Sequence, residues 1–353
     1  MLDLSKKERI SHQIIKVLST RFQSFPSDSS ANRNAPFHEA FLQAFHNKLD
    51  EKMTDVPYLI SLSSWLHGLN TTLGQSFFEK VANILSGGEK RSFSKSNLLQ
   101  VTAFQKVVIA DIITDLKNRQ ARPDLANENY RLFNGEPSSM VKANQFDADV
   151  FIEEADRVIA IELKSVKPNA GELRGEKQKI LEGKAALFHA FPGKEIYFYI
   201  GFPFDPTSAR SEPMSSDKER FLTNIVDGKK YFDFEEVLLA EELWNFLSGE
   251  QDTMGEILDL INKIATPEFI VKYELIKEPK NFLRNQEKYL NILEEWSLLS
   301  DLNLLMKLSS SQVNQRILQN DRQAQRLFNS YLFKDDDGSY NLNRRLALND
   351  KLI

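Results

Sequence analysis

The 353-residue sequence contains no cysteine, only 14 glycines and only 12 prolines. The absence of cysteine excludes disulfides, thiolate zinc sites and cysteine nucleophiles, and it fits a reducing compartment. Hydrophobic residues make up 41% of the chain, so the composition predicts a folded globular protein with a large core rather than a disordered chain.

Long apolar runs are also missing. No segment is apolar over the length that a bilayer requires, and the charged N-terminal segment lacks a signal-peptide core. We therefore expect no membrane partner. The net charge of −5 argues weakly against a nucleic-acid partner, but the distribution of charge along the chain matters more than its sum.

Outside the middle of the chain, the apolar residues mostly have the spacing of amphipathic helices. Such helices are predicted over 4–22, 37–49, 73–85, 98–117, 171–190, 234–247, 253–264 and much of the chain after 281. A polar connection separates the first group of helices from the middle segment. We divide the chain into a helical N-terminal part packed on the core (1–125), a core (126–265) and a helical C-terminal extension (266–353).

The middle segment contains two short apolar runs, Val150–Ile152 and Val158–Ile161, on either side of a polar turn. Both runs suit strands, and the short polar linker predicts a hairpin. A third strand is predicted at Glu195–Phe202, and the helix before it completes a strand–helix–strand unit, so this strand should pair in parallel. The sequence therefore predicts an α/β fold with a mixed sheet flanked by helices.

Charged residues gather at one end of this hairpin. Because side chains alternate along a strand, Glu162 and Lys164 should share one face, with Leu163 turned into the core. Asp147 and Asp149 should share a face for the same reason. Two carboxylates suit a hard divalent cation such as magnesium, and a nearby amine suits a phosphodiester bound to that cation. The alternative is an exposed ion pair with no function.

An acidic residue that opens one strand, followed by Glu-x-Lys at the end of the next, resembles the PD-(D/E)XK motif of restriction-endonuclease-like nucleases. In this sequence the motif is Asp149, Glu162 and Lys164. The proline that often precedes the first aspartate is replaced by Ala148. This departure leaves Asp147 as the reserve metal ligand.

The run IAIELKSVKPNAGELRGEKQKILEGKAAL, followed by IYFYIGFPFDP, is similar to type II restriction endonucleases of the TdeIII kind. The resemblance extends into 235–249 and covers the two ends of the chain poorly. It implies a restriction-endonuclease-like core that hydrolyses phosphodiester bonds in double-stranded DNA at a specific short sequence, with Mg²⁺ as cofactor. The alternatives are a nuclease of DNA repair or mobile-element defence, or an inactive DNA-binding module of the same fold.

The same resemblance implies roles and partners. Asp149 and Glu162 would bind the metal, and Lys164 would serve the phosphate and the attacking water. Glu79 resembles an acidic position that some of these nucleases place near the metal; a charge on the surface of a core helix is the alternative. Cutting both strands needs two active sites, which favours a homodimer. A bacterial cytoplasmic location and a cognate DNA methyltransferase are also implied, and 266–353 is a candidate for DNA recognition or dimerisation.

Basic residues outnumber acidic ones by seven to three between Lys164 and Lys194, which reverses the charge of the whole chain beside the proposed site. The seven are Lys164, Lys167, Arg174, Lys177, Lys179, Lys184 and Lys194. Predicted phosphate contacts on this helix are Arg174, Lys177, Gln178 and Lys184. The alternative is a solvated helix face.

A second candidate DNA contact is the segment 311–331, which is rich in Arg and Gln. We predict one amphipathic helix, with an apolar stripe of Val313, Ile317, Ala324, Leu327 and Tyr331. Arginine pairs with guanine and glutamine with adenine in the major groove, so Arg316 and Arg322 are predicted to contact DNA. An ordinary amphipathic helix with a polar face is the alternative.

Overall fold

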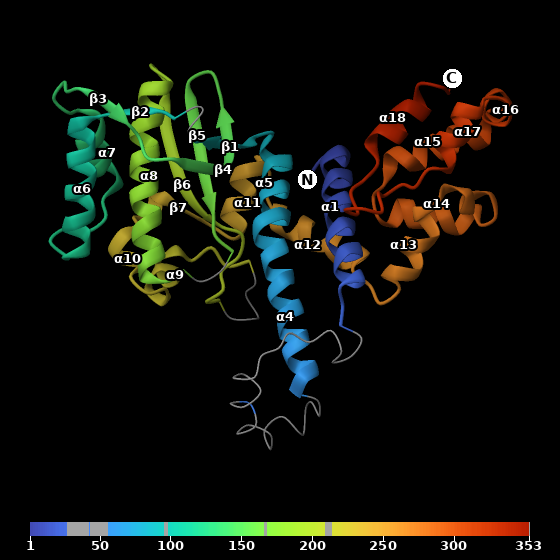
Figure 1. Cartoon of the computed structure of the whole chain (residues 1–353), viewed down its shortest axis with the longest axis horizontal. Coiled ribbons are helices and arrows are strands. Elements are labelled where there is room, and N and C mark those ends of the chain that lie inside the picture. Colours follow the sequence, from blue (N-terminus) through green and yellow to red (C-terminus); the bar gives the residue numbers. More distant parts are fainter. Residues whose placement is uncertain (27–41, 43–55, 95–97, 166–167, 209–213, 353) are drawn as a thin grey trace. The chain divides into compact units, whose positions relative to one another are not determined.

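The computed structural model describes residues 1–26, 42, 56–94, 98–165, 168–208 and 214–352 (Figure 1). The chain forms two compact units. Unit 1 comprises Met1–Leu2 and Phe78–Leu258, and unit 2 comprises Asp3–Phe77 and Asp259–Ile353. The division differs from the three predicted parts, because Phe78–Leu258 belongs with the sheet whereas the first helix belongs with the C-terminal helices. The helix predicted over 37–49 lies outside the described residues.

Unit 1 is built on a five-stranded mixed sheet. Across the sheet the strands are β1 (Glu89–Phe93), β4 (Phe146–Glu153), β5 (Arg157–Leu163), β6 (Glu195–Phe202) and β7 (Val237–Leu239). The pairs β1–β4 and β4–β5 are antiparallel, whereas β5–β6 and β6–β7 are parallel. The predicted α/β class, the hairpin and the parallel third strand are thus confirmed.

Helices cover both faces of this sheet (Figure 1). On one face, α8 (Ala170–Ala190) packs on β6, and α6 (Ala103–Lys117) packs on the outer side of α8. On the other face lie α5 (Glu79–Ser86) and α11 (Glu241–Ser248), which pack on each other and on β4 and β7. This layering is the expected way to bury a sheet of apolar strands on both sides.

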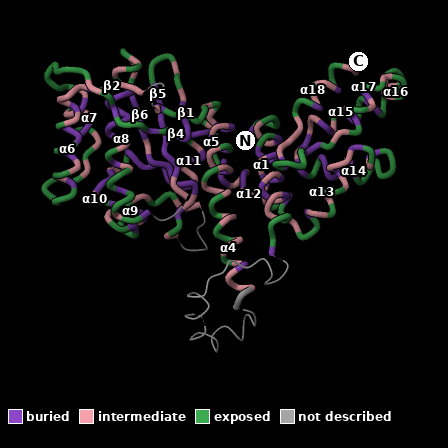
Figure 2. The backbone as a smooth tube through the Cα atoms, in the orientation of Figure 1, coloured by how far each residue is buried: buried purple, intermediate pink, exposed green. Residues whose placement is uncertain are grey.

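Two glycines allow the helices to approach the sheet closely. A Cβ on Gly183 of α8 would lie 2.5 Å from the ring of Phe198, and a Cβ on Gly201 of β6 would lie 3.1 Å from Leu243 of α11. Carbon atoms in contact normally lie about 3.5–4.0 Å apart, so a side chain at either position would push the layers apart. Buried residues accordingly concentrate in the central strands and in the side of α8 that faces them (Figure 2).

Unit 1 has six further short elements among the described residues. They are the strands β2 (Gln100–Thr102) and β3 (Met140–Lys142), the helices α7 (Leu125–Phe133), α9 (Lys218–Asn224) and α10 (Gly228–Tyr231), and the 3-10 turn η3 (Phe234–Glu236). The helix predicted over 234–247 is wrong in its first half, because η3 and the buried strand β7 precede α11. Ala240, with a φ of 50°, separates that strand from the helix.

Unit 2 is helical. Its elements are α1 (Leu4–Gln23), α4 (Val56–Thr72), the π-helical turn η2 (Leu73–Phe78), α13 (Phe269–Lys277), η4 (Pro279–Leu283), α14 (Gln286–Glu295), α15 (Leu299–Ser310), α16 (Gln312–Asn320), α17 (Arg322–Asn329) and α18 (Leu342–Asn349). The helix α12 (Thr253–Ile264) spans the boundary between the units. Phe269 and Trp296 stack at the centre of unit 2, with ring centroids 5.4 Å apart. Within the part of the chain that the structure describes, no helix has the length and apolar character to cross a membrane.

The single helix predicted over 311–331 is instead two helices, α16 and α17. Asp321 adopts an extended conformation between them, and its carboxylate accepts hydrogen bonds from the backbone N–H groups of Gln323 and Ala324. An aspartate in this position caps the next helix, so it ends one helix and begins another. The predicted apolar stripe is therefore wrong in part, because Val313 is exposed whereas Ala324 is buried.

Candidate active site

The two carboxylates of the motif meet where β4 and β5 pair. Val150 pairs with Ile161, so the next step of the antiparallel ladder places Asp149 opposite Glu162. Both residues are largely buried, with side chains that are 11% and 8% exposed. The Oδ2 atom of Asp149 accepts a hydrogen bond of 2.9 Å from the backbone N–H of Leu163, which fixes the carboxylate against the neighbouring strand.

The amine of the motif lies on the same side of β5 as Glu162. The Nζ atom of Lys164 is 3.0 Å from Oε1 of Glu162 and 2.8 Å from Oε1 of Glu176 in α8. Leu163, between the two motif residues, is buried. The predicted alternation of Glu162, Leu163 and Lys164 is thus confirmed, and the structure brings the three motif residues together.

Helix α8 adds a second acid–base pair to this cluster. Lys179 lies 2.7 Å from Oε1 of Glu162 and 3.2 Å from Glu176, three residues earlier on the same helix. The first turn of α8 is fixed by reciprocal hydrogen bonds between Asn169 and Glu172, which form a capping box. The start of the helix, and with it the position of both side chains beside β5, is therefore well defined.

Burial and neighbouring charge change the protonation of this cluster. Burial raises the pKa of Glu162, and the nearby Asp149 carboxylate raises it further, against the opposing effect of Lys179 and Lys164. For Lys164, burial acts to lower the pKa, but the carboxylates of Glu162 and Glu176 outweigh burial and raise it. The site therefore combines crowded acids with a firmly protonated amine.

A further acid and a further base lie on the other side of Asp149. Lys90 of β1 is 3.2 Å from Oδ1 of Asp149 and 2.8 Å from Oε2 of Glu79, the first residue of α5. Burial raises the pKa of Glu79, and the Asp149 carboxylate contributes in the same direction. Asp147 pairs with Ser92 in the β1–β4 ladder and is exposed, unlike Asp149.

The donor set fits a magnesium ion. Magnesium is usually held by one or two carboxylates, with water and substrate phosphate oxygens completing its coordination. Asp149 and Glu162 supply two such groups. Burial first, and then the nearby Asp149 carboxylate, raises the pKa of Glu162, and a dication would offset the negative charge of both groups. Among the described residues, no cluster of three or more Asp, Glu, His or Cys side chains is close enough to hold a metal by itself.

Two of the predicted phosphate contacts are corrected by the structure. Lys177 and Lys184 are 0% and 2% exposed, and both ammonium groups contact the buried carboxylate of Glu236; Lys177 also contacts Glu128. A completely buried ammonium cannot reach a DNA phosphate, so these two lysines are part of the interior. They lie at the same helical spacing as Leu173, which also points into the core.

The other predicted DNA contacts are on the surface of their own units. Arg174 and Gln178 are exposed on α8 in unit 1, and Arg316 and Arg322 are exposed in unit 2. Lys167, which contributed to the predicted basic segment, lies outside the described residues. DNA contact by these four exposed side chains remains a prediction.

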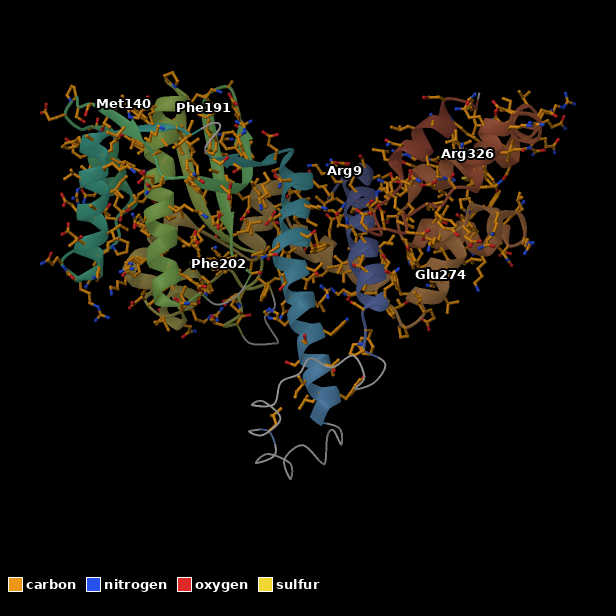
Figure 3. The ribbon with its side chains drawn as sticks, viewed as in Figure 1. Arg9, Met140, Phe191, Phe202, Glu274 and Arg326 are labelled. Carbon is orange, nitrogen blue, oxygen red and sulfur yellow. The ribbon has the colours of Figure 1, made fainter. Side chains whose placement is uncertain are left out.

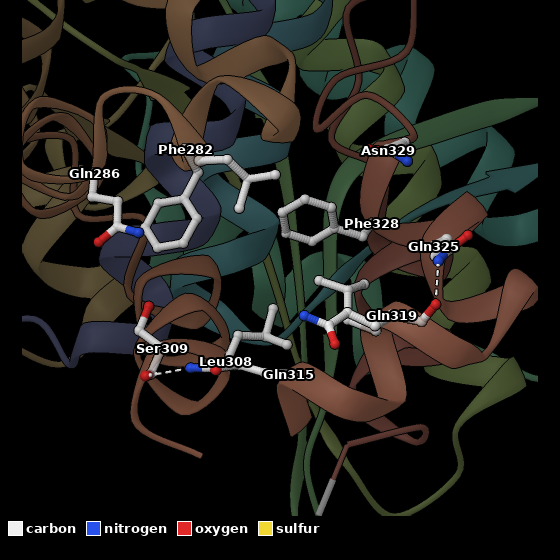
Figure 4. A pocket seen from close by; sticks show the side chains of 11 residues that line it. Phe282, Gln286, Leu308, Ser309, Gln315, Gln319, Gln325, Phe328 and Asn329 are labelled. Atoms are coloured by element: carbon white, nitrogen blue, oxygen red, sulfur yellow. Dashed lines mark hydrogen bonds between the residues drawn. The ribbon is translucent and has the colours of Figure 1, made fainter. Parts of the chain in front are cut away.

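Helices α16 and α17 border a cavity of about 530 Å³ in unit 2 (Figure 4). Its lining includes the phenyl rings of Phe282 and Phe328 and several side-chain amides. Two of these amides are held by backbone carbonyls, since Gln315 donates to Ser309 and Gln325 donates to Gln319. Arg326 on α17, labelled in Figure 3, is exposed and does not line this cavity.

Comparisons with known proteins identify the family. The family model described as "Type II restriction endonuclease, HinfI" matches residues 4–265. The type II restriction enzyme MjaII of Methanocaldococcus jannaschii is 42% identical over 98% of this chain and 97% of its own length. This chain belongs to the HinfI family of type II restriction endonucleases. The predicted activity, that of a type II restriction endonuclease, is thereby confirmed. All the residues of the candidate active site lie within the matched region.

A second relative of this endonuclease is the type II restriction enzyme HgiCII of Herpetosiphon aurantiacus. It is 21% identical over 59% of this chain and 73% of its own length. The family model ends at 265, so the helices α13–α18 of unit 2 lie beyond it. The M. jannaschii enzyme, in contrast, is similar over almost the whole chain.

The sequence reasoning missed three charged residues that contact the motif. Lys90 was not considered, because β1 is short and polar and has no strand signal of its own. Lys179 is one of the seven basic residues between 164 and 194 and Glu176 is one of the three acidic ones, but neither is among the predicted site residues. Their spacing of three residues, which places both on one helix face beside a Glu-x-Lys strand, was the available signal.

Proposed function

We propose that this restriction endonuclease hydrolyses DNA at the cluster formed by Asp149, Glu162 and Lys164, with Mg²⁺ as cofactor. The observation that carries the proposal is the meeting of two buried carboxylates and one ammonium at the paired ends of β4 and β5. Asp149 and Glu162 hold the metal. A bound magnesium ion supplies Lewis-acid polarisation of the phosphodiester and makes an adjacent water more acidic.

The protein groups have separate tasks. The ammonium of Lys164 lies beside the metal-binding carboxylate Glu162 and offsets the negative charge that develops on the phosphate during attack. Its raised pKa supports this electrostatic role over proton abstraction, because a firmly protonated amine does not act as a base at neutral pH. Glu176 and Lys179 position Lys164 and Glu162 through the contacts from α8.

The substrate is double-stranded DNA, and we propose that the enzyme acts on it as a homodimer in the cytoplasm. Two active sites related by a two-fold axis would cut both strands of a symmetric sequence. The exposed side chains Arg174 and Gln178 of α8 are proposed to contact phosphates near the site. A cognate DNA methyltransferase is the expected genetic partner, because the cell's own copies of the target need protection.

Digestion of unmethylated phage DNA by the purified full-length protein tests this proposal. We expect discrete fragments when Mg²⁺ is present, none with EDTA, and one sequence shared by all fragment ends. A control with DNA methylated by the expected cognate methyltransferase should stay intact. Cleavage that persists in EDTA would overturn the assignment of magnesium, and a smear without a common end sequence would indicate a nuclease that is not site-specific.

A further inference from the structure

Lys90 occupies an unusual position between two acids of the site. Its ammonium lies 2.8 Å from Glu79 and 3.2 Å from Asp149. The β1–β4 register is irregular at this point, since Glu89 pairs with Phe151 but Arg91 pairs with Ala148. Such bulges re-aim side chains and are frequent near active sites. The irregularity sets Lys90 against the stretch of β4 that carries Asp149.

The two oxygens of the Asp149 carboxylate have different partners. Oδ2 accepts the backbone hydrogen bond from Leu163, whereas Oδ1 is the atom that contacts Lys90. Oδ1 has no such backbone donor, so it is the oxygen of Asp149 that is more open to a metal ion, and it is the atom that Lys90 contacts. An ammonium and a dication on the same oxygen atom would repel each other strongly. The contact with Lys90 therefore competes with metal binding at Oδ1.

Lys90 is able to leave. Its side chain is 51% exposed, in contrast to Glu79 at 15% and Asp149 at 11%. The ammonium can rotate into solvent on its flexible stem. Its departure leaves the carboxylate of Glu79 near Asp149 with no ammonium between them.

We propose that Lys90 is a built-in counter-cation, which holds Oδ1 of Asp149 and the carboxylate of Glu79 in the metal-free enzyme and must be displaced when a divalent cation binds. The inference rests on the proposed function, because it takes Asp149 as a metal ligand. Lys90 is a positioning residue. In the metal-free enzyme it holds the carboxylates of Glu79 and Asp149 close together, and it lowers the affinity of the site for divalent cations.

The test measures metal binding without DNA. Isothermal titration of the full-length protein with Mg²⁺, and separately with Ca²⁺, compares the wild type with Lys90→Met, which keeps the unbranched stem of the side chain and removes its charge. The matched control is Lys80→Met, which makes the same charge change at an exposed lysine of α5. We expect Lys90→Met to bind either ion about tenfold more tightly, within the usual range of coupling between two ligands, and Lys80→Met to behave as the wild type.

A second readout follows Lys90 itself. Acetylation footprinting by mass spectrometry should label Lys90 slowly in the metal-free wild type and faster once Mg²⁺ is added, with no change at Lys80. Unchanged or weaker metal affinity in Lys90→Met, while Asp149→Asn loses metal binding, would overturn the role of Lys90 alone. Metal affinity retained in Asp149→Asn would overturn the proposed metal site, and the role of Lys90 with it.

Discussion

Helix α8 carries two groups of charged residues, one partly exposed and the other buried. Glu176 and Lys179 contact the motif residues on β5, and their side chains are 16% and 25% exposed. Lys177 and Lys184 point to the interior and contact the carboxylate of Glu236, which is 0% exposed. The two groups alternate within a few residues of one helix, yet only the first can respond to a ligand.

The difference lies in what surrounds each charge. A partly exposed ion pair can exchange its partner for water, a metal or a phosphate at little cost. A buried ammonium has lost its hydration, so it is stable only while its carboxylate partners remain in place. Basic residues near a nuclease site therefore fall into substrate contacts and structural charges, and burial distinguishes the two.

The largest effect is expected at the site itself. Glu162→Ala and Lys164→Ala should each reduce DNA cleavage on the order of 10³-fold, because one removes a metal ligand and the other removes the ammonium that offsets charge on the phosphate. Cleavage rates under single-turnover conditions measure the loss, and circular dichroism checks the fold. Lys142→Ala, at an exposed lysine of β3, is the control. A variant of either motif residue that cuts at the wild-type rate would show that the site is assigned wrongly.

The interior charges should instead determine stability. Lys177→Met leaves Glu236 and Glu128 short of a counter-charge in the core, and we expect the free energy of unfolding to fall by about 3–5 kcal/mol. Lys179→Met, the matched change on the other face of α8, should cost less than about 1 kcal/mol. Urea denaturation of both variants gives the comparison. Equal losses would mean that burial does not separate the two groups.

Sequence patterns predict those parts of unit 1 in which apolar residues follow the periodicity of a strand or a helix. The Val- and Ile-rich runs at 150–152 and 158–161 predicted the hairpin, and alternation predicted that Glu162 and Lys164 share a face. The strand β7 escaped prediction because three buried residues show no periodicity that distinguishes a strand from a helix.

The failure at Lys177 has a different cause. Lys177 and Lys184 lie four residues after the buried Leu173 and Ile180, a spacing that puts them on the buried face, whereas the sequence analysis predicts both lysines as phosphate contacts. The acids that make their burial possible are far away in the sequence, and Glu236 lies 59 residues after Lys177. No local pattern connects these residues, so only the tertiary fold reveals that the charges are structural.

Unit 2 also contains a buried basic side chain, that of His12, which can be compared with the buried lysines of α8. His12 is 8% exposed and stacks on Tyr340 at 3.7 Å, and among the described atoms its Nε2 has no hydrogen-bond partner. Burial, with smaller contributions from Arg345 and Arg9, lowers the pKa of His12 to about 3. Below pH 6.5 the unfolded chain binds a proton at His12 that the folded chain does not bind. The free energy of unfolding therefore decreases as the pH is lowered.

The expected slope is about 1.4 kcal/mol per pH unit between the ordinary histidine pKa and the lowered one, or roughly 2 kcal/mol between pH 6.5 and 5. His12→Phe, which keeps the stacking on Tyr340, should remove this part of the acid sensitivity in urea denaturation at the two pH values. His67→Phe, at an exposed histidine of α4, should leave it in place. The same acid sensitivity in His12→Phe and the wild type would contradict the assignment.

The smallest effect is expected for the exposed residues of α8, and it completes the contrast with Lys177. Arg174→Ala should weaken DNA binding severalfold and reduce the slope of log affinity against log salt by about 1, because one phosphate contact is lost. Gln178→Ala should weaken binding without changing that slope, because the amide carries no charge. Fluorescence anisotropy with Ca²⁺ in place of Mg²⁺ measures both. A wild-type slope in Arg174→Ala would mean that this face of α8 is merely solvated, and that the basic residues of the helix serve the fold and the active site without touching the DNA backbone.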